Sequence, residues 1–111
     1  MDQPSPTPMD LLKQTAPEFA QNQLDQRGLL FESSKYQAVP LKYKLIAGIA
    51  VAAALGSVTC TEMWTQMALQ KGVTPTEIGE AILVVRYMKM ATVNDTASSS
   101  MAMILTQAKE Q

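Results

Sequence analysis

The residues best placed for chemistry lie in one short stretch, where Ser57, Cys60, Trp64 and Met67 follow one another at intervals of three or four positions. On an α-helix this spacing puts all four side chains on one face. That face would present a hydroxyl, a thiol, an indole and a thioether. Cys60 would lie in the first helical turn, where exposed amides and the helix dipole stabilise a thiolate. One interpretation is therefore a reactive cysteine, and the alternative is a buried, inert one, which the pattern favours.

The chain has no histidine and a single cysteine. Without histidine, the commonest general base near neutral pH is missing. Peroxide reduction by Cys60 would also need a second thiol to recycle the sulfenic acid. The indole of Trp64 is a hydrogen-bond donor only and cannot act as a base, so we expect it in the core or in a pocket wall. A lone thiol suits the reducing cytoplasm.

A second group of polar side chains comprises Arg86, Tyr87 and Lys89. It could bind a small carboxylate, although solvated positions at a helix end explain these residues equally well. The eight methionines of the chain indicate adaptable packing in a core or between subunits rather than a ligand pocket. The patterns of phosphate-binding loops, dinucleotide sites, zinc sites and serine hydrolases are not present. We therefore expect no cofactor and no metal.

The composition restricts the classes of partner. Nine basic and ten acidic residues among 111 give a net charge of −1, which provides no basic surface for nucleic acid or for an anionic membrane. The most apolar stretch, LIAGIAVAAALGSV, is shorter than the ~20 residues of a membrane-spanning helix. The first ten residues lack the features of a signal peptide. We expect a cytoplasmic protein without nucleic-acid or membrane partners.

The elements that would position these residues are all helical, because no stretch alternates with the period of a strand. Proline-rich residues 1–8 are expected to form a flexible arm, followed by a single domain over residues 9–111. On the second helix, Phe19, Leu24, Leu30 and Phe31 are expected to be the apolar anchors. The expected helices are 9–15, 17–33, 40–55, 57–71, one that begins at 74, and 92–108.

The third expected helix has almost no polar residue after Lys44, so we expect it to be buried on all sides. Gly56 would end it, Ser57 would cap the next helix, and Gly72 would end that one in a left-handed conformation. Thr74 and Glu77 form a capping box around the next start.

The helix that follows carries two apolar stripes, one with Ile78 and Val85 and one with Leu83 and Tyr87. Such a helix lies between layers or at a subunit interface. The last helix is expected to turn Met101, Ile104 and Leu105 inward. Together these elements carry more apolar surface than a 12 kDa core can hide, and the chain is expected to form a closed homo-oligomer.

Residues 38–57, AVPLKYKLIAGIAVAAALGS, resemble the pattern A-L-P-x-K-x-K-E-L-I-x-x-A-V-x-x-A-x-G-C of the carboxymuconolactone decarboxylase/AhpD-like family. The stretch VTCTEMWTQMALQKGVTPTEIGEAI continues the likeness with x-x-C-x-x-x-H-x-x-x-A-x-x-x-G-x-T-x-E-E-I-x-E-A. The resemblance implies an AhpD-like all-α fold of about six helices that assembles as a trimer or a hexamer. Its anchors are Pro40, Lys42, Lys44, Ala50, Gly56, Ala68, Gly72, Thr74, Glu77, Ile78 and Glu80.

The resemblance also assigns positions to the family's chemistry. Its thiol peroxidases use a C-x-x-C pair, a histidine four residues further on and a glutamate twelve residues before the first cysteine. These positions hold Ser57 and Cys60, Trp64 and Leu45 here, so only Cys60 is kept. In the decarboxylase branch, a glutamate and a histidine stand where this chain has Cys60 and Trp64. Tyr87 fits that branch, as does Asn94, but its Gly-x-Pro turn is replaced by residues 89–91.

The sequence therefore predicts a family member with a degenerate active site. We expect a non-peroxidase oligomer that is structural or binds a small apolar or carboxylate ligand, with an apolar cleft beside Trp64 that includes Leu45, Ser57 and Met67. The alternative is an enzyme of altered chemistry. It would be decarboxylase-like or lyase-like, using Tyr87, Arg86 or Cys60, or a one-cysteine peroxidase that relies on Cys60.

Overall fold

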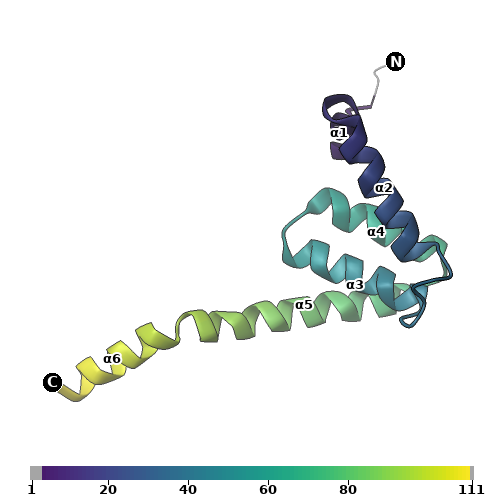
Figure 1. Ribbon diagram of the computed structural model, residues 1–111. Helices are drawn as coiled ribbons and strands as arrows, with labels where there is room; N and C mark the ends of the chain where they lie inside the picture. The colour runs from purple at the N-terminus through teal and green to yellow at the C-terminus, as the bar shows by residue number, and fades with distance from the viewer. Residues whose placement is uncertain (1–3, 111) are drawn as a thin grey trace. The chain divides into compact units, whose positions relative to one another are not determined.

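The computed structural model describes residues 4–110, and over that range it contains helices and no strand, which confirms the all-α prediction (Figure 1). The chain divides into two compact units, Met1–Leu41 and Lys42–Gln111. No helix in the described part of the chain is long and apolar enough to cross a membrane. The helices are α1 (Pro8–Thr15), α2 (Pro17–Phe31), α3 (Leu41–Ala54), α4 (Val58–Gln70), α5 (Pro75–Thr96) and α6 (Ser98–Glu110).

The first unit begins with a capping box. The Thr7 hydroxyl accepts a hydrogen bond from the Asp10 amide at 3.1 Å, and the Asp10 carboxylate accepts one from the Thr7 amide at 3.0 Å. Pro8 and Pro17 occupy the first turns of α1 and α2. Of the expected flexible arm, residues 1–3 lie outside the described chain, and its last two residues already belong to the start of α1.

The buried stripe of α2 differs from the expected one. Ala20 is buried and Leu24 and Phe31 are half-buried, whereas Phe19 is 72% exposed and Leu30 is also exposed. The choice of Phe19 and Leu30 as anchors was therefore wrong. The reason is geometrical, because neighbouring residues on a helix point about 100° apart and a stripe through Ala20 and Leu24 leaves Phe19 beside it.

In the second unit, two tight turns connect α3 to α4 and α4 to α5. Gly56 has φ +80° and Gly72 has φ +90°, as the sequence predicted for helix ends. In the first turn, the Ser57 amide donates to the Ala52 carbonyl at 3.0 Å and the Gly56 amide to the Ala53 carbonyl at 3.1 Å. In the second turn, the Val73 amide donates to the Ala68 carbonyl and the Gly72 amide to the Leu69 carbonyl. Both turns are therefore Schellman motifs.

One face of α3 supplies much of the core. Leu45, Ile49 and Ala52 are buried at intervals of three or four residues, together with Ala68 and Val73 and with Ile78 and Ala81 of α5. The expectation that α3 is buried on all sides was wrong, because Tyr43 and Val51 are exposed. A unit with only a few helices has too few layers to enclose one of them completely.

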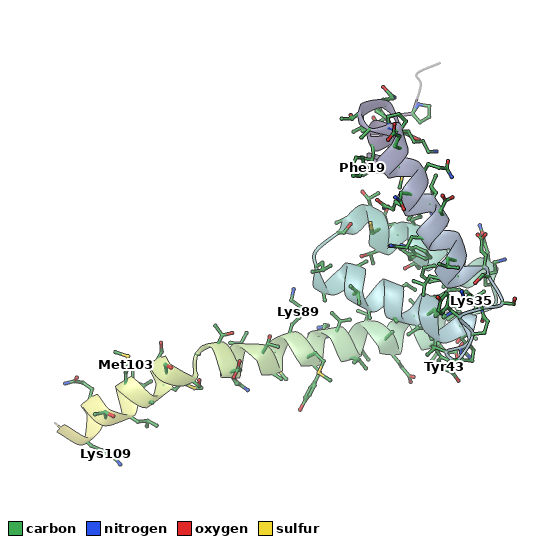
Figure 2. All side chains as sticks on the ribbon, in the orientation of Figure 1. Phe19, Lys35, Tyr43, Lys89, Met103 and Lys109 are labelled. Carbon is green, nitrogen blue, oxygen red and sulfur yellow. The ribbon has the colours of Figure 1, made fainter. Side chains whose placement is uncertain are left out.

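Helices α3 and α5 are joined at both ends. Lys42 forms an ion pair with Glu77 where the two helices begin, and the Lys89 ammonium donates to the Ala54 carbonyl at 3.4 Å where α3 ends (Figure 2). Both contacts join residues that are 35 positions apart, so α3 and α5 run parallel and in register. A cation at the carbonyl end of a helix also interacts favourably with its dipole.

The last helix differs from the prediction in its start and in its orientation. Helix α5 continues to Thr96, and α6 begins at Ser98 rather than at residue 92. No glycine or proline lies near residue 92 to end α5 there. Met101, Ile104 and Leu105 were expected to face inward but are 42%, 67% and 64% exposed. They are exposed because α6 continues beyond the end of α5 instead of folding back along it (Figure 1).

Candidate functional site

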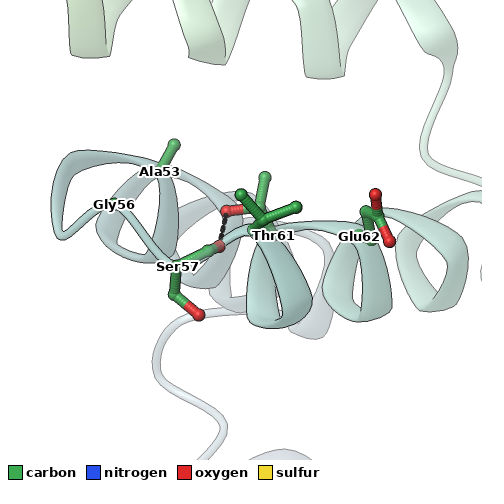
Figure 3. Close-up of a pocket in the computed structure, with 6 residues that line it drawn as sticks. Ala53, Gly56, Ser57, Thr61 and Glu62 are labelled. Atoms are coloured by element: carbon green, nitrogen blue, oxygen red, sulfur yellow. Dashed lines mark hydrogen bonds between the residues drawn. The ribbon is translucent and has the colours of Figure 1, made fainter. Parts of the chain in front are cut away.

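Ser57 and Cys60 lie at the start of α4, where backbone and side chain hold each other in place. The Ser57 hydroxyl accepts a hydrogen bond from the Cys60 amide at 3.2 Å, as expected of an N-cap residue. The Thr61 hydroxyl donates to the Ser57 carbonyl at 2.6 Å (Figure 3). Cys60 is a free, half-buried thiol in the first turn, so it is neither fully exposed nor sealed in the core.

A shallow, open hollow of about 240 Å³ adjoins this helix start, and apolar atoms form most of its surface (Figure 3). Of the residues predicted for the site, only Ser57 lines it. The Ser57–Thr61 spacing of one helical turn was the sequence signal that could have identified Thr61 as a neighbour. The lining residues are Ala53, Gly56, Ser57, Val58, Thr61 and Glu62.

Trp64 packs between α4 and α3 rather than lining the hollow. A methyl group in place of a Gly48 hydrogen would lie 3.9 Å from Cδ2 of the indole, an ordinary contact distance. Leu45, one turn earlier on α3, is 1% exposed, and Met67 is half-buried. Two of the side chains predicted for the cleft are therefore a core leucine and an indole that packs against α3.

Arg86 and Tyr87 share a second hollow, of about 310 Å³, with Leu83 and Met90 on the outer face of α5. Lys89 is not among its lining residues. It lies on the α3 side of the helix, where it donates to the Ala54 carbonyl. The structure thus brings together two of the three residues of the predicted polar group, and it gives the third a contact between helices.

A capping box and an ion pair at the start of α5 serve the fold. The Glu77 carboxylate accepts a hydrogen bond from the Thr74 amide at 2.9 Å in a capping box, and it forms an ion pair with Lys42. The hydrogen bond from Lys42, followed by the one from the Thr74 backbone, lowers the pKa of Glu77 from 4.5 to about 2. The same contact raises the pKa of Lys42. Across residues 4–110, no three acidic, cysteine or histidine side chains gather as they would around a metal ion.

Comparisons with known proteins agree with the resemblance seen in the sequence. No curated protein matches this chain. Among solved structures, the crystal structure of a structural-genomics target from Methanobacterium thermoautotrophicum is similar, with a TM-score of 0.69 and 26% sequence identity. The match covers 78% of this chain and 93% of that one. The family model for "Carboxymuconolactone decarboxylase family" matches residues 17–105, and the chain therefore belongs to the carboxymuconolactone decarboxylase family.

Proposed function

We propose that this protein is an oligomeric, small-molecule-binding family member that does not reduce peroxides through a cysteine pair. The observation that carries the proposal is that the Trp64 indole lies beside Gly48, 3.9 Å from where a Cβ would be, one turn from the buried Leu45. In the peroxidases that this chain resembles, a histidine stands at the position of Trp64 and a glutamate at that of Leu45, and these two residues move protons. The indole of Trp64 cannot accept a proton, and the side chain of Leu45 has no proton that it can exchange. The chain has no histidine to activate Cys60 and no second cysteine to pair with it.

A peroxidase assay tests the first half of this proposal. The protein is mixed with a hydroperoxide and a lipoyl or thioredoxin donor, and thiol consumption is followed by stopped flow. We expect the parent and the Cys60→Ser variant to give the same background rate, because the chain has no histidine to activate Cys60 and no second cysteine to form the internal disulfide that the donor would reduce. Turnover that disappears in Cys60→Ser would show a one-cysteine peroxidase instead.

The ligand that fits the hollow beside Ser57 is a small, neutral, apolar molecule. The lining is mainly apolar, and its volume of about 240 Å³ is just below the ~300–1,000 Å³ of common ligand pockets. Glu62, the acidic residue of the lining, is exposed at its edge and disfavours an anion.

Trp64 provides the binding assay, because it is the only tryptophan and lies one helical turn from Thr61. Titration with benzyl alcohol should change the Trp64 fluorescence to a saturating level. Ala53→Phe should fill the hollow and abolish the change, whereas Ala47→Phe, on an exposed part of α3, should leave it intact. An equal response in the parent and in Ala53→Phe would show that the hollow is not the site.

An enzyme of altered chemistry is the second candidate, and the shared hollow of Arg86 and Tyr87 favours it. A guanidinium can hold a carboxylate there while a tyrosine hydroxyl exchanges a proton. Decarboxylase-like or lyase-like turnover of a lactone carboxylate, of the kind that the family's name denotes, would then fall in Tyr87→Phe and Arg86→Ala. Absence of turnover in the parent protein excludes this candidate for that substrate.

We also propose a trimer or a hexamer in the cytoplasm. The assembly is supported by the exposed apolar side chains on α5 and α6, and the compartment by the lone thiol. Light scattering should report one of these masses at micromolar concentration. A stable monomer would contradict the assembly without affecting the peroxidase or the ligand-binding result.

A further inference from the structure

Helix α6 lacks a partner of its own within the described chain. Its stripe of Met101, Ile104, Leu105 and Ala108 recurs at helical spacing, and all four residues are exposed. Helix α6 meets α5 only around their junction at Ala97 (Figure 1). An isolated helix of thirteen residues is only marginally stable in water. The stripe of α6 therefore needs a covering surface.

The outer face of α5 offers such a surface. Leu83, Tyr87 and Met90 follow one another at intervals of three or four residues and are 56%, 60% and 59% exposed. With Arg86 they border the hollow of about 310 Å³. Ridges spaced in this way pack into the grooves of a second helix with matching spacing, and the stripe on α6 has that spacing. A chain cannot cover its own outer face with its own α6, because α6 continues away from α5.

The charge pattern and the presence of both surfaces on one chain favour a second copy as the occupant. Between residues 90 and 109, only Asp95 and Lys109 are charged, so neither an acidic nor a basic partner is selected. The stripe itself carries no charge, so it can pack against the apolar residues of the α5 face without like-charge repulsion. Every chain also carries one stripe and one outer face, so identical copies can join head to tail, and such an assembly forms a ring when the rotation between copies closes.

We propose that the α6 stripe of one copy packs against the Leu83–Tyr87–Met90 face of α5 in a second copy. This inference rests on the oligomeric part of the proposed function and specifies where the copies meet. The contact buries both apolar surfaces at once, and it leaves the hollow beside Ser57 free for a ligand. Arg86 then lies at the edge of the interface rather than in a separate binding site.

Cross-linking between differently tagged copies tests the contact directly. Both carry Cys60→Ser, which removes the native cysteine; one adds Tyr87→Cys and the other Ile104→Cys. After the copies are unfolded and refolded together, a short bismaleimide should join the two tags on a denaturing gel. A mixture of Tyr87→Cys with Thr106→Cys is the control, since Thr106 lies away from the stripe and should give little product.

Light scattering supplies the second measurement. Ile104→Glu with Leu105→Glu should convert the oligomer to monomers and lower the helical circular dichroism, because the stripe loses its cover. Thr106→Glu with Gln107→Glu adds the same charge to the other side of α6 and should leave the mass unchanged. An oligomeric parent without the mixed cross-link overturns this inference and leaves the proposed assembly standing. A monomeric parent overturns both.

Discussion

At the residue scale, Glu77 shows how one side chain stabilises two local structures. Its carboxylate closes the capping box of α5 and pairs with Lys42 of α3. These contacts hold its pKa near 2 instead of 4.5, so the folded protein keeps this carboxylate charged in acid where the unfolded chain binds a proton. The stabilisation is complete above pH 4.5 and is lost as the pH falls towards 2.

Glu77→Gln separates the two roles, because glutamine also completes a capping box but carries no charge. We expect the variant to melt below the parent at neutral pH, and the difference to shrink between pH 4.5 and 2, where the parent loses its own charge. Glu77→Ala, which loses the cap as well, should remain less stable in acid. Thermal melts followed by circular dichroism measure this. A Gln variant whose deficit does not change with pH would show that the ion pair contributes nothing.

Gly48 gives a second prediction about a single residue. Glycine inside a helix costs about 0.5–1 kcal/mol relative to alanine. A methyl group at this position would meet the Trp64 indole at ordinary contact distance rather than clash with it. Gly48→Ala should therefore raise the free energy of unfolding by about 0.5–1 kcal/mol in urea titrations. Gly48→Leu should lower it, because a longer side chain must displace the indole. Two variants of equal stability would mean that Trp64 does not pack there.

At the element scale, the turn between α3 and α4 depends on backbone conformation more than on space. A side chain at Gly56 or at Gly79 would meet no atom within 4 Å. Gly56 has φ +80°, however, whereas Gly79 lies inside α5 without a positive φ. Gly56→Ala should cost about 1–2 kcal/mol, and Gly79→Ala should gain about 0.5–1 kcal/mol. Chemical denaturation of the pair measures both, and effects of the same sign would refute the argument.

The helix ends could be predicted from the sequence because their interactions lie within a few residues of each other. Ser57, Gly72 and the Thr74–Glu77 box all occupy their predicted places. The separation of Lys89 from Arg86 could not be predicted in this way. It depends on the parallel register of α3 and α5, which is set by contacts 35 positions apart. The hollow beside Ser57 was missed for the same reason, since it needs the exact course of the Gly56 turn.

At the scale of the whole molecule, apolar periodicity predicts which residues need cover but not what covers them. The spacing of Met101, Ile104 and Leu105 is that of a buried stripe and predicts core residues. In the single chain they are exposed. The pattern is the same whether the covering surface comes from the same chain or from a second copy, so sequence alone does not distinguish core from interface.

Coupling of folding to assembly gives the last prediction. If copies cover each other's stripes, association stabilises the folded state by mass action, and a hundredfold rise in protein concentration adds up to about 2.7 kcal/mol. For a chain of this size, 1 kcal/mol shifts the melting temperature by roughly 4–8 °C. The melting temperature should therefore rise by several degrees between micromolar and hundredfold higher concentration. It should stay constant in the Ile104→Glu/Leu105→Glu variant. A parent whose melting temperature is independent of concentration would show that the exposed stripe is not stabilised by a second copy.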